Sequence, residues 1–162
     1  MLCALCIALS AAVQFVFPGF GADCALYFAV FLCAACCPLH YGILCALLCP
    51  LVSMMAVAAP AAVLYPAGSA KCLAFLFLSK LLLRRIHTEK LLRDLYICLV
   101  PSVCAGQVID ALICAALFCG DIYSAIVFIS ERLIASIPKI ALLLAVTPGT
   151  VMLLKNLGIV EE

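Results

Sequence analysis

LSKLLLRRIHTEKLLRD, the stretch from Leu78 to Asp94, is where charged residues concentrate in an otherwise apolar sequence. It holds five of the nine Lys and Arg residues of the chain, namely Lys80, Arg84, Arg85, Lys90 and Arg93. Short segments rich in Lys and Arg stay on the cytoplasmic side of a membrane. We therefore interpret the stretch as a solvated cytoplasmic loop that orients the hydrophobic segments on both sides of it. Contact with a cytoplasmic partner stays open as a further role.

The composition of the 162-residue chain indicates an integral membrane protein. Hydrophobic residues make up 70% of it and charged residues 10%, against roughly 25% charged residues in a soluble domain. The formal net charge is +1 and there is no basic arm, so nucleic-acid binding, which needs several cations on one face, is excluded. At about 20 residues for each membrane span, the chain has room for about six helices.

Turn residues divide this single membrane domain into six expected spans. The connections are marked by proline and glycine at 18–21, by proline at 38 and by glycine at 120. Prolines at 60 and 66 disfavour a helix over 58–66, where we expect a loop folded back as a lid. The all-α prediction places helices at residues 2–17, 23–37, 41–57, 66–84, 95–119 and 124–154. Because the last segment is too long for one span, we expect a partly helical outer part at 124–135 and a span at 137–154.

The basic loop also predicts the orientation of these spans. Counting from it, the N terminus, the turn at Pro38 and the C terminus are cytoplasmic, and the connections near 18, 58 and 120 face outward. The three outer connections contain no Lys or Arg, and Lys155 falls on the cytoplasmic side. The prediction therefore agrees with the positive-inside rule.

Five ionisable residues fall toward the outer halves of the expected spans: Lys71, Asp110, Glu131, Arg132 and Lys139. Each costs several kcal/mol in a bilayer unless it is paired or hydrated. One explanation is an internal ion pair of Lys71 with Asp110, and the other is a solvated pocket open to the outside; the two are compatible. Gln107 lies three residues from Asp110, on the same helix face. For such a pocket, we expect the binding residues to be Lys71, Gln107, Asp110, Arg132 and Lys139.

Thirteen cysteines raise the question of thiol or metal chemistry. Cys3 with Cys6, and Cys33 with Cys36, have the CxxC spacing that such chemistry uses. Each pair lies inside an apolar run without histidine at ligand spacing, and buried cysteine packs as a small hydrophobic residue. We therefore expect neither a metal nor another cofactor, and interpret the abundance of cysteine as a sign of a reducing habitat.

The first expected helix has a small residue at every fourth position: Ala4, Ala8 and Ala12. Such a stripe lets another helix approach closely, either within the bundle or from another protein. A cleaved signal peptide is the alternative for this segment. However, the segment lacks the basic residues that such a leader carries.

Several stretches resemble one family of membrane proteins. Residues 136–158, SIPKIALLLAVTPGTVMLLKNLG, resemble the final helix of the substrate-binding S components of energy-coupling factor (ECF) vitamin transporters, with Pro138 and Pro148 at the family's spacing. Residues 28–55, FAVFLCAACCPLHYGILCALLCPLVSMM, and residues 64–75, LYPAGSAKCLAF, are similar to two further motifs of that family. The alanine stripe is similar to the family's own. The resemblance thus covers nearly the whole chain.

The resemblance implies a transport subunit that is not itself an enzyme. It implies that the chain captures a small water-soluble vitamin or precursor on the outer face, beneath the three outer connections. Two partner ATPase subunits would then drive its delivery inward through a transmembrane coupling subunit, on which the stripe of Ala4, Ala8 and Ala12 would dock. The implied location is the inner (plasma) membrane of a prokaryote, with several passes through the bilayer.

Departures from the family fall on residues expected in the pocket. Leu26 and Ala70 stand where relatives often carry His and Glu, and Lys139 replaces a Gly. Gln107 and Asp110 replace an Arg and a Tyr. We therefore expect the pocket to differ from its relatives in chemistry.

A membrane thiol-disulfide oxidoreductase that uses the CxxC pairs is the alternative function. Such an enzyme needs a reactive cysteine pair at one membrane face. The expected topology puts Cys33 and Cys36 near the cytoplasmic end of their helix, which is the wrong side for oxidising secreted proteins.

Overall fold

The computed structural model describes residues 2–16, 20–57, 65–86 and 91–156. These residues form six α-helices, so the all-α prediction is confirmed. The helices are α1 (Leu2–Val16), α2 (Phe20–Cys36), α3 (Leu39–Val57), α4 (Tyr65–Arg85), α5 (Leu91–Phe118) and α6 (Ile122–Asn156). Most of the loop expected as a lid, residues 58–64, lies outside the described residues, as do residues 87–90 of the basic stretch.

The expected helix bounds are met within a few residues, with one exception. α6 is a single helix of 35 residues, so the division expected near residue 136 is wrong. It continues through Pro138 and Pro148, although each proline removes one backbone donor. Apolar bundles tolerate such prolines where hydroxyl groups and neighbouring helices bind the freed carbonyls. Near the two prolines, the hydroxyl of Ser136 donates to the Leu133 carbonyl at 2.7 Å, and that of Thr150 donates to the Thr147 carbonyl at 2.8 Å. The carbonyls that lose a donor are those four residues before each proline, Ile134 and Leu144.

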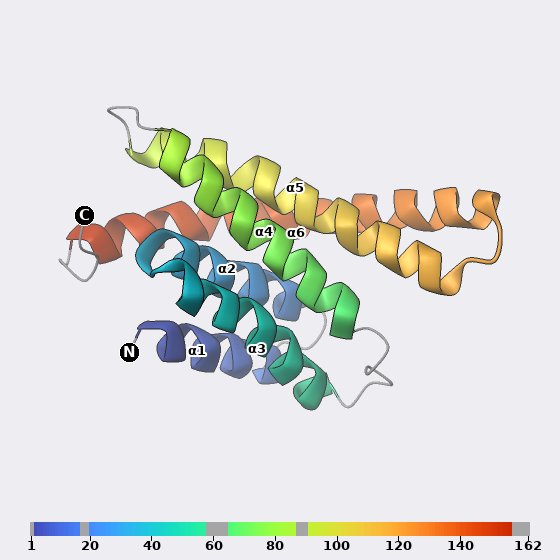
Figure 1. Cartoon of the computed structure of the whole chain (residues 1–162), viewed down its shortest axis with the longest axis horizontal. Helices are drawn as coiled ribbons and strands as arrows, with labels where there is room; N and C mark the ends of the chain where they lie inside the picture. Colours follow the sequence, from blue (N-terminus) through green and yellow to red (C-terminus); the bar gives the residue numbers. More distant parts are fainter. Residues whose placement is uncertain (1, 17–19, 58–64, 87–90, 157–162) are drawn as a thin grey trace.

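α2 lies in the middle of the bundle and contacts α1, α3, α4 and α6 (Figure 1). α5 packs between α4 and α6. The ring of Tyr27 on α2 meets the ring of Phe75 on α4 edge to face, with centroids 4.9 Å apart. Gly42 allows α3 to approach α4, because a Cβ there would lie 2.7 Å from the Leu76 Cδ1 atom. The core is therefore made by residues from both halves of the chain.

Three of the helices in the described residues, α4, α5 and α6, are long and apolar enough to cross a membrane. They have 21, 28 and 35 residues, whereas the apolar helices α1, α2 and α3 have 15, 17 and 19. At about 1.5 Å per residue, the three short helices reach about 22–29 Å, just under a hydrocarbon core of about 30 Å. The joined ends of α5 and α6 extend past the other helices (Figure 1). The chain is compatible with a membrane protein.

Basic residues at the ends of α4 and α6 lie at one end of the bundle. Arg84 and Arg85 lie in the last turn of α4, and Lys155 lies in the last turn of α6. The start of α1 and the α2–α3 turn lie at this same end (Figure 1). We call it the basic end. The arrangement is the one that the positive-inside count requires, with every second connection on the same side.

Lys80 belongs to α4, within the helix expected over residues 66–84. Its Nζ atom donates to the carbonyls of Ala34 and Cys37, each at 2.8 Å. The last carbonyls of a helix have no partner within that helix. Lys80 therefore caps the C-terminal end of α2 and ties it to α4.

Candidate functional site

A cavity of about 340 Å³ lies between α2, α4, α5 and α6. Within α5 and α6, the residues that line it are three, four or seven positions apart, because residues at these spacings share one face of a helix. Gln107, Asp110 and Cys114 line it from α5, and Arg132, Ser136 and Lys139 line it from α6. The remaining wall comes from α2 and α4, through Asp23, Ala67, Gly68 and Lys71. Four helices thus bring polar side chains to one place inside an apolar bundle.

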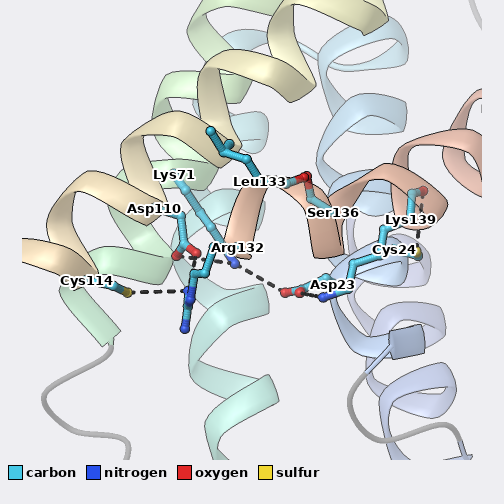
Figure 2. A network of polar contacts seen from close by, with 9 residues as sticks. All are labelled: Asp23, Cys24, Lys71, Asp110, Cys114, Arg132, Leu133, Ser136 and Lys139. Atoms are coloured by element: carbon cyan, nitrogen blue, oxygen red, sulfur yellow. Dashed lines mark hydrogen bonds and ion pairs between the residues drawn. The ribbon is translucent and has the colours of Figure 1, made fainter. Parts of the chain in front are cut away.

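Five charged side chains form a row of ion pairs across this cavity (Figure 2). Lys139 Nζ lies 2.6 Å from Asp23 Oδ2, and Lys71 Nζ lies 3.2 Å from Asp23 Oδ1. Lys71 Nζ is also 3.6 Å from Asp110 Oδ1, and Arg132 Nη1 lies 2.6 Å from Asp110 Oδ2. We call these five residues the charge row. Cations and anions alternate along it, and both of its ends are cations.

Burial differs along the charge row. The side chains of Lys71 and Asp110 are 10% and 11% exposed, those of Lys139 and Asp23 are 25% and 31% exposed, and that of Arg132 is 42% exposed. A buried charge without a partner is very costly, so the two most buried members need the contacts that they make. Lys71 also lies over the Tyr27 ring, 5.9 Å from its centroid, which adds a cation–π contact.

Close packing of α5 on α4 brings Asp110 beside Lys71. A Cβ at Gly106 would lie 3.0 Å from the Tyr27 hydroxyl oxygen and 3.4 Å from the Lys71 carbonyl oxygen. Gly106 lies one helical turn before Asp110. Glycine there therefore allows the backbones of α4 and α5 to approach closely near the ion pair of Lys71 with Asp110. A larger residue would push apart the helices that carry Lys71 and Asp110.

The structure brings together the five residues that the sequence analysis expects in a binding pocket. Lys71, Asp110, Arg132 and Lys139 belong to one charge row, and the expected pair of Lys71 with Asp110 is present. The fifth expected residue, Gln107, lines the same cavity. Glu131 does not belong to this site, since it lies on the exposed side of α6 and lines a separate hollow near Tyr123.

Asp23 is the member of the site that the sequence-based prediction missed. It is the first residue of the span expected at 23–37, and an acid is common there because it suits the N-terminal end of a helix dipole. Yet it is the first acidic residue of the chain, and the next one is Glu89. A lone acid in so long an apolar sequence is the signal that would have identified it as a partner for the intramembrane lysines.

The alanine stripe does not pack inside the bundle. Ala4, Ala8 and Ala12 are all exposed, whereas the opposite side of α1 is buried through Cys3, Cys6, Ser10 and Gln14. Leu5 and Leu9, beside the stripe, are 65% and 48% exposed. Of the two roles open for the stripe, contact within the chain is thus excluded for the described residues.

All thirteen cysteines are free thiols. Cys3, Cys6 and Cys33 are buried in the apolar core where α1, α2 and α3 meet. The Sγ atoms of Cys3, Cys33 and Cys45 lie within 4.8 Å of one another, the one such group of potential ligands in the described residues. It contains no histidine or carboxylate, and its members pack as small apolar side chains.

Comparison with known proteins identifies no relative of this chain. No protein-family model matches it, and neither a curated protein nor a solved structure does. The features of the chain that bear on its function are the charge row, the cavity and the exposed face of α1.

Proposed function

We propose that the chain is the substrate-capture S component of an ECF-type ABC importer. It binds a small water-soluble vitamin or precursor at the outer face of a prokaryotic plasma membrane. A transmembrane coupling subunit and two ATPase subunits complete the importer, and ATP hydrolysis takes place in these partners. The observation that carries the proposal is the polar cavity of about 340 Å³ enclosed by four helices of an apolar bundle.

The cost of the polar side chains favours a binding role over a structural one. A bundle of apolar helices needs no ionisable residue to be stable in a bilayer, and intramembrane charges usually mark a pathway or a binding site. Ion pairs alone would close on one another without leaving space. Here the charge row borders a cavity whose volume falls in the usual range for small-molecule sites, roughly 300–1,000 Å³.

The position of the cavity supports capture from outside. Asp23 lies in the first turn of α2, Lys71 lies six residues from the start of α4, and Asp110 lies eight residues from the end of α5. These helix ends are all opposite to the basic end (Figure 1). With six spans and the basic end in the cytoplasm, as the positive-inside rule requires, the cavity lies in the outer half of the membrane.

The exposed alanine stripe supports a partner helix. Small side chains on a lipid-facing helix surface allow another helix to pack closely over a long contact. This surface lies on α1, which contributes no residue to the lining of the cavity. Capture and docking are thus assigned to separate parts of the molecule.

Thiol-disulfide oxidoreductase activity is less well supported. A cysteine that attacks a disulfide must be reachable by its substrate and must form a thiolate. In both CxxC pairs the first cysteine is buried, with Cys3 8% and Cys33 0% exposed. Replacing Cys3, Cys6, Cys33 and Cys36 by Ser should leave transport intact, and loss of a thiol-exchange activity in that variant would favour the enzyme.

Replacement of Ala8 by Trp tests the proposed function. The bulky side chain would keep a partner helix several ångströms from α1 while leaving the cavity untouched. We expect ligand binding by the isolated variant to be unchanged, whereas co-purification with the coupling subunit and ATPases and ATP-driven uptake should be lost. Leu112→Trp, at a position 52% exposed on α5, is the matched control and should keep uptake. Uptake by Ala8→Trp at the wild-type rate would refute the docking surface.

A further inference from the structure

The side chains that line the cavity do not balance in charge. Lys71, Arg132 and Lys139 contribute three positive charges, whereas Asp23 and Asp110 contribute two negative ones. The cavity therefore has a net charge of +1 at neutral pH. An excess charge is costly in a low-dielectric interior, and a ligand with a single negative charge would remove that cost.

Both carboxylates of the cavity already have two cationic partners each. Asp23 is in contact with Lys139 and Lys71, and Asp110 is in contact with Lys71 and Arg132. A ligand with one positive charge would raise the net charge of the cavity from +1 to +2. The arrangement thus disfavours amines and favours anions.

Arg132 has unused donors at the more exposed end of the charge row. Guanidinium has five N–H groups, and it binds carboxylates through two parallel hydrogen bonds. In the described residues only Nη1 is engaged, by Asp110 at 2.6 Å and by the Cys114 sulfur at 3.5 Å. Figure 2 shows the other terminal nitrogen directed away from both partners. Lys71, by contrast, is buried between two carboxylates.

Gln107 offers neutral hydrogen-bonding groups to the cavity. Its side chain lines the cavity, and the residue is only 9% exposed. An amide has two N–H donors and one carbonyl acceptor. It is suited to a neutral polar group, such as an amide or a hydroxyl, on the same ligand.

We propose that the cavity recognises an organic monoanion, whose carboxylate binds the free side of Arg132 with support from Lys139, and whose neutral polar part bonds Gln107. The proposal names the ligand class of the proposed capture subunit and rests on that function. Lys71 organises the two acids and does not touch the carboxylate. The same structure thus assigns different roles to three cations that the sequence could not distinguish.

A panel of matched compounds tests this assignment on the purified full-length protein. Each small carboxylic acid is paired with its primary amide, such as nicotinate with nicotinamide, hippurate with hippuramide and biotin with biotinamide, and binding is measured as thermal stabilisation in detergent. At least one acid should stabilise the protein while its amide does not. Equal stabilisation by an amide or an amine, or no stabilisation by any acid, would overturn the proposal.

Variants then locate the carboxylate. Arg132→Gln should weaken binding of the active acid by roughly tenfold or more, the scale of a charged hydrogen bond, and Arg132→Lys should restore it in part. Glu131→Gln, at the next residue and outside the cavity, is the matched control and should bind like the wild type. If Arg132→Gln fails to fold, Arg132→Gln with Asp110→Asn keeps the net charge at +1 and should fold without binding the acid. Unchanged affinity in either Arg132→Gln protein refutes the role of Arg132.

Identifying the charge of the natural ligand tests this inference independently of the proposed function. Mass spectrometry of small molecules released from the protein, purified from its host, should identify a compound with one carboxylate. A neutral or cationic compound, together with the expected behaviour of Ala8→Trp, would refute the anion site and leave the transport role standing. Absence of both ligand and uptake would refute the transport role itself.

Discussion

The alternation of charges along the row decides which replacements the site tolerates. Removal of Lys71, its central member, leaves two complete pairs, because Asp23 keeps Lys139 and Asp110 keeps Arg132. Removal of Asp23 leaves Lys139 without a carboxylate in the described residues. The most buried cation is therefore not the residue on which stability depends most.

This difference gives a testable order of stability. Asp23→Asn should lower the free energy of unfolding by about 3 kcal/mol, the scale of a buried pair that loses one partner. Lys71→Met should cost less than half of that, since no charge loses its last partner. Unfolding in mixed micelles with rising SDS measures both values.

A double replacement provides the control for that order. Adding Lys139→Met to Asp23→Asn removes the orphaned cation and should recover part of the lost stability, so the two changes should not be additive. A larger loss for Lys71→Met than for Asp23→Asn, or strict additivity in the double variant, would contradict the proposed balance of the row.

At the residue scale, an energetic argument predicted most of the site. Lys71, Asp110, Arg132 and Lys139 were identifiable because each is an ionisable group in an apolar segment. Asp23 was missed because its position at a helix start offered a local explanation for the same residue type. Which cation keeps free donors depends on three-dimensional pairing, and no sequence pattern reports it.

At the scale of elements, Lys80 joins two helices that are distant in sequence. Its two hydrogen bonds to the end of α2 bind carbonyls that would otherwise have no donor. Lys80→Met should therefore lower the free energy of unfolding by about 1.5–3 kcal/mol, since hydrogen bonds to a charged group are involved.

Arg85→Met is the matched control for Lys80. Arg85 is also a cation near the end of α4, but it is exposed. Its replacement should change the free energy of unfolding by less than about 0.5 kcal/mol, as is usual for surface positions. Equal effects of the two variants, measured by the same SDS titration, would show that Lys80 acts only through the basic charge of that end.

Helix bounds could be predicted from turn residues, but the length of α6 could not. Proline, glycine and the change in composition near residues 18, 38 and 120 end helices for local reasons. Pro138 and Pro148 are also local signals, yet α6 continues through both. α6 packs against α2 and α5, and this packing favours a continuous helix. Packing partners are not visible in a local pattern.

At the scale of the whole molecule, the two ends of the bundle should face opposite sides of the membrane. Single cysteines at Arg85 and at Tyr123, in a background without other cysteines, test this. Both residues are exposed, and they lie at opposite ends of the bundle. A membrane-impermeant maleimide applied to intact cells should label position 123 and should label position 85 only after the cells are opened.

Labelling of both positions from the same side would refute the six-span topology. It would mean that α5, the long helix between the two positions, does not cross the bilayer. The number of helices follows from composition and length. Their placement in a bilayer depends on tilt and on neighbouring helices, which a single apolar segment does not specify.

The residues of the charge row are also synthesised in a fixed order. Asp23 is synthesised first, Lys71 follows 48 residues later, and Arg132 follows Asp110 by 22 residues. At about 5–20 residues per second, the 116 residues from Asp23 to Lys139 take roughly 6–23 s to make. From Asp23 to Arg132, each newly synthesised charge is opposite in sign to the one before it. The net charge of the growing site therefore never exceeds one unit. The surplus positive charge arrives with Lys139 on the last helix, so the cavity becomes cationic only when the bundle is complete.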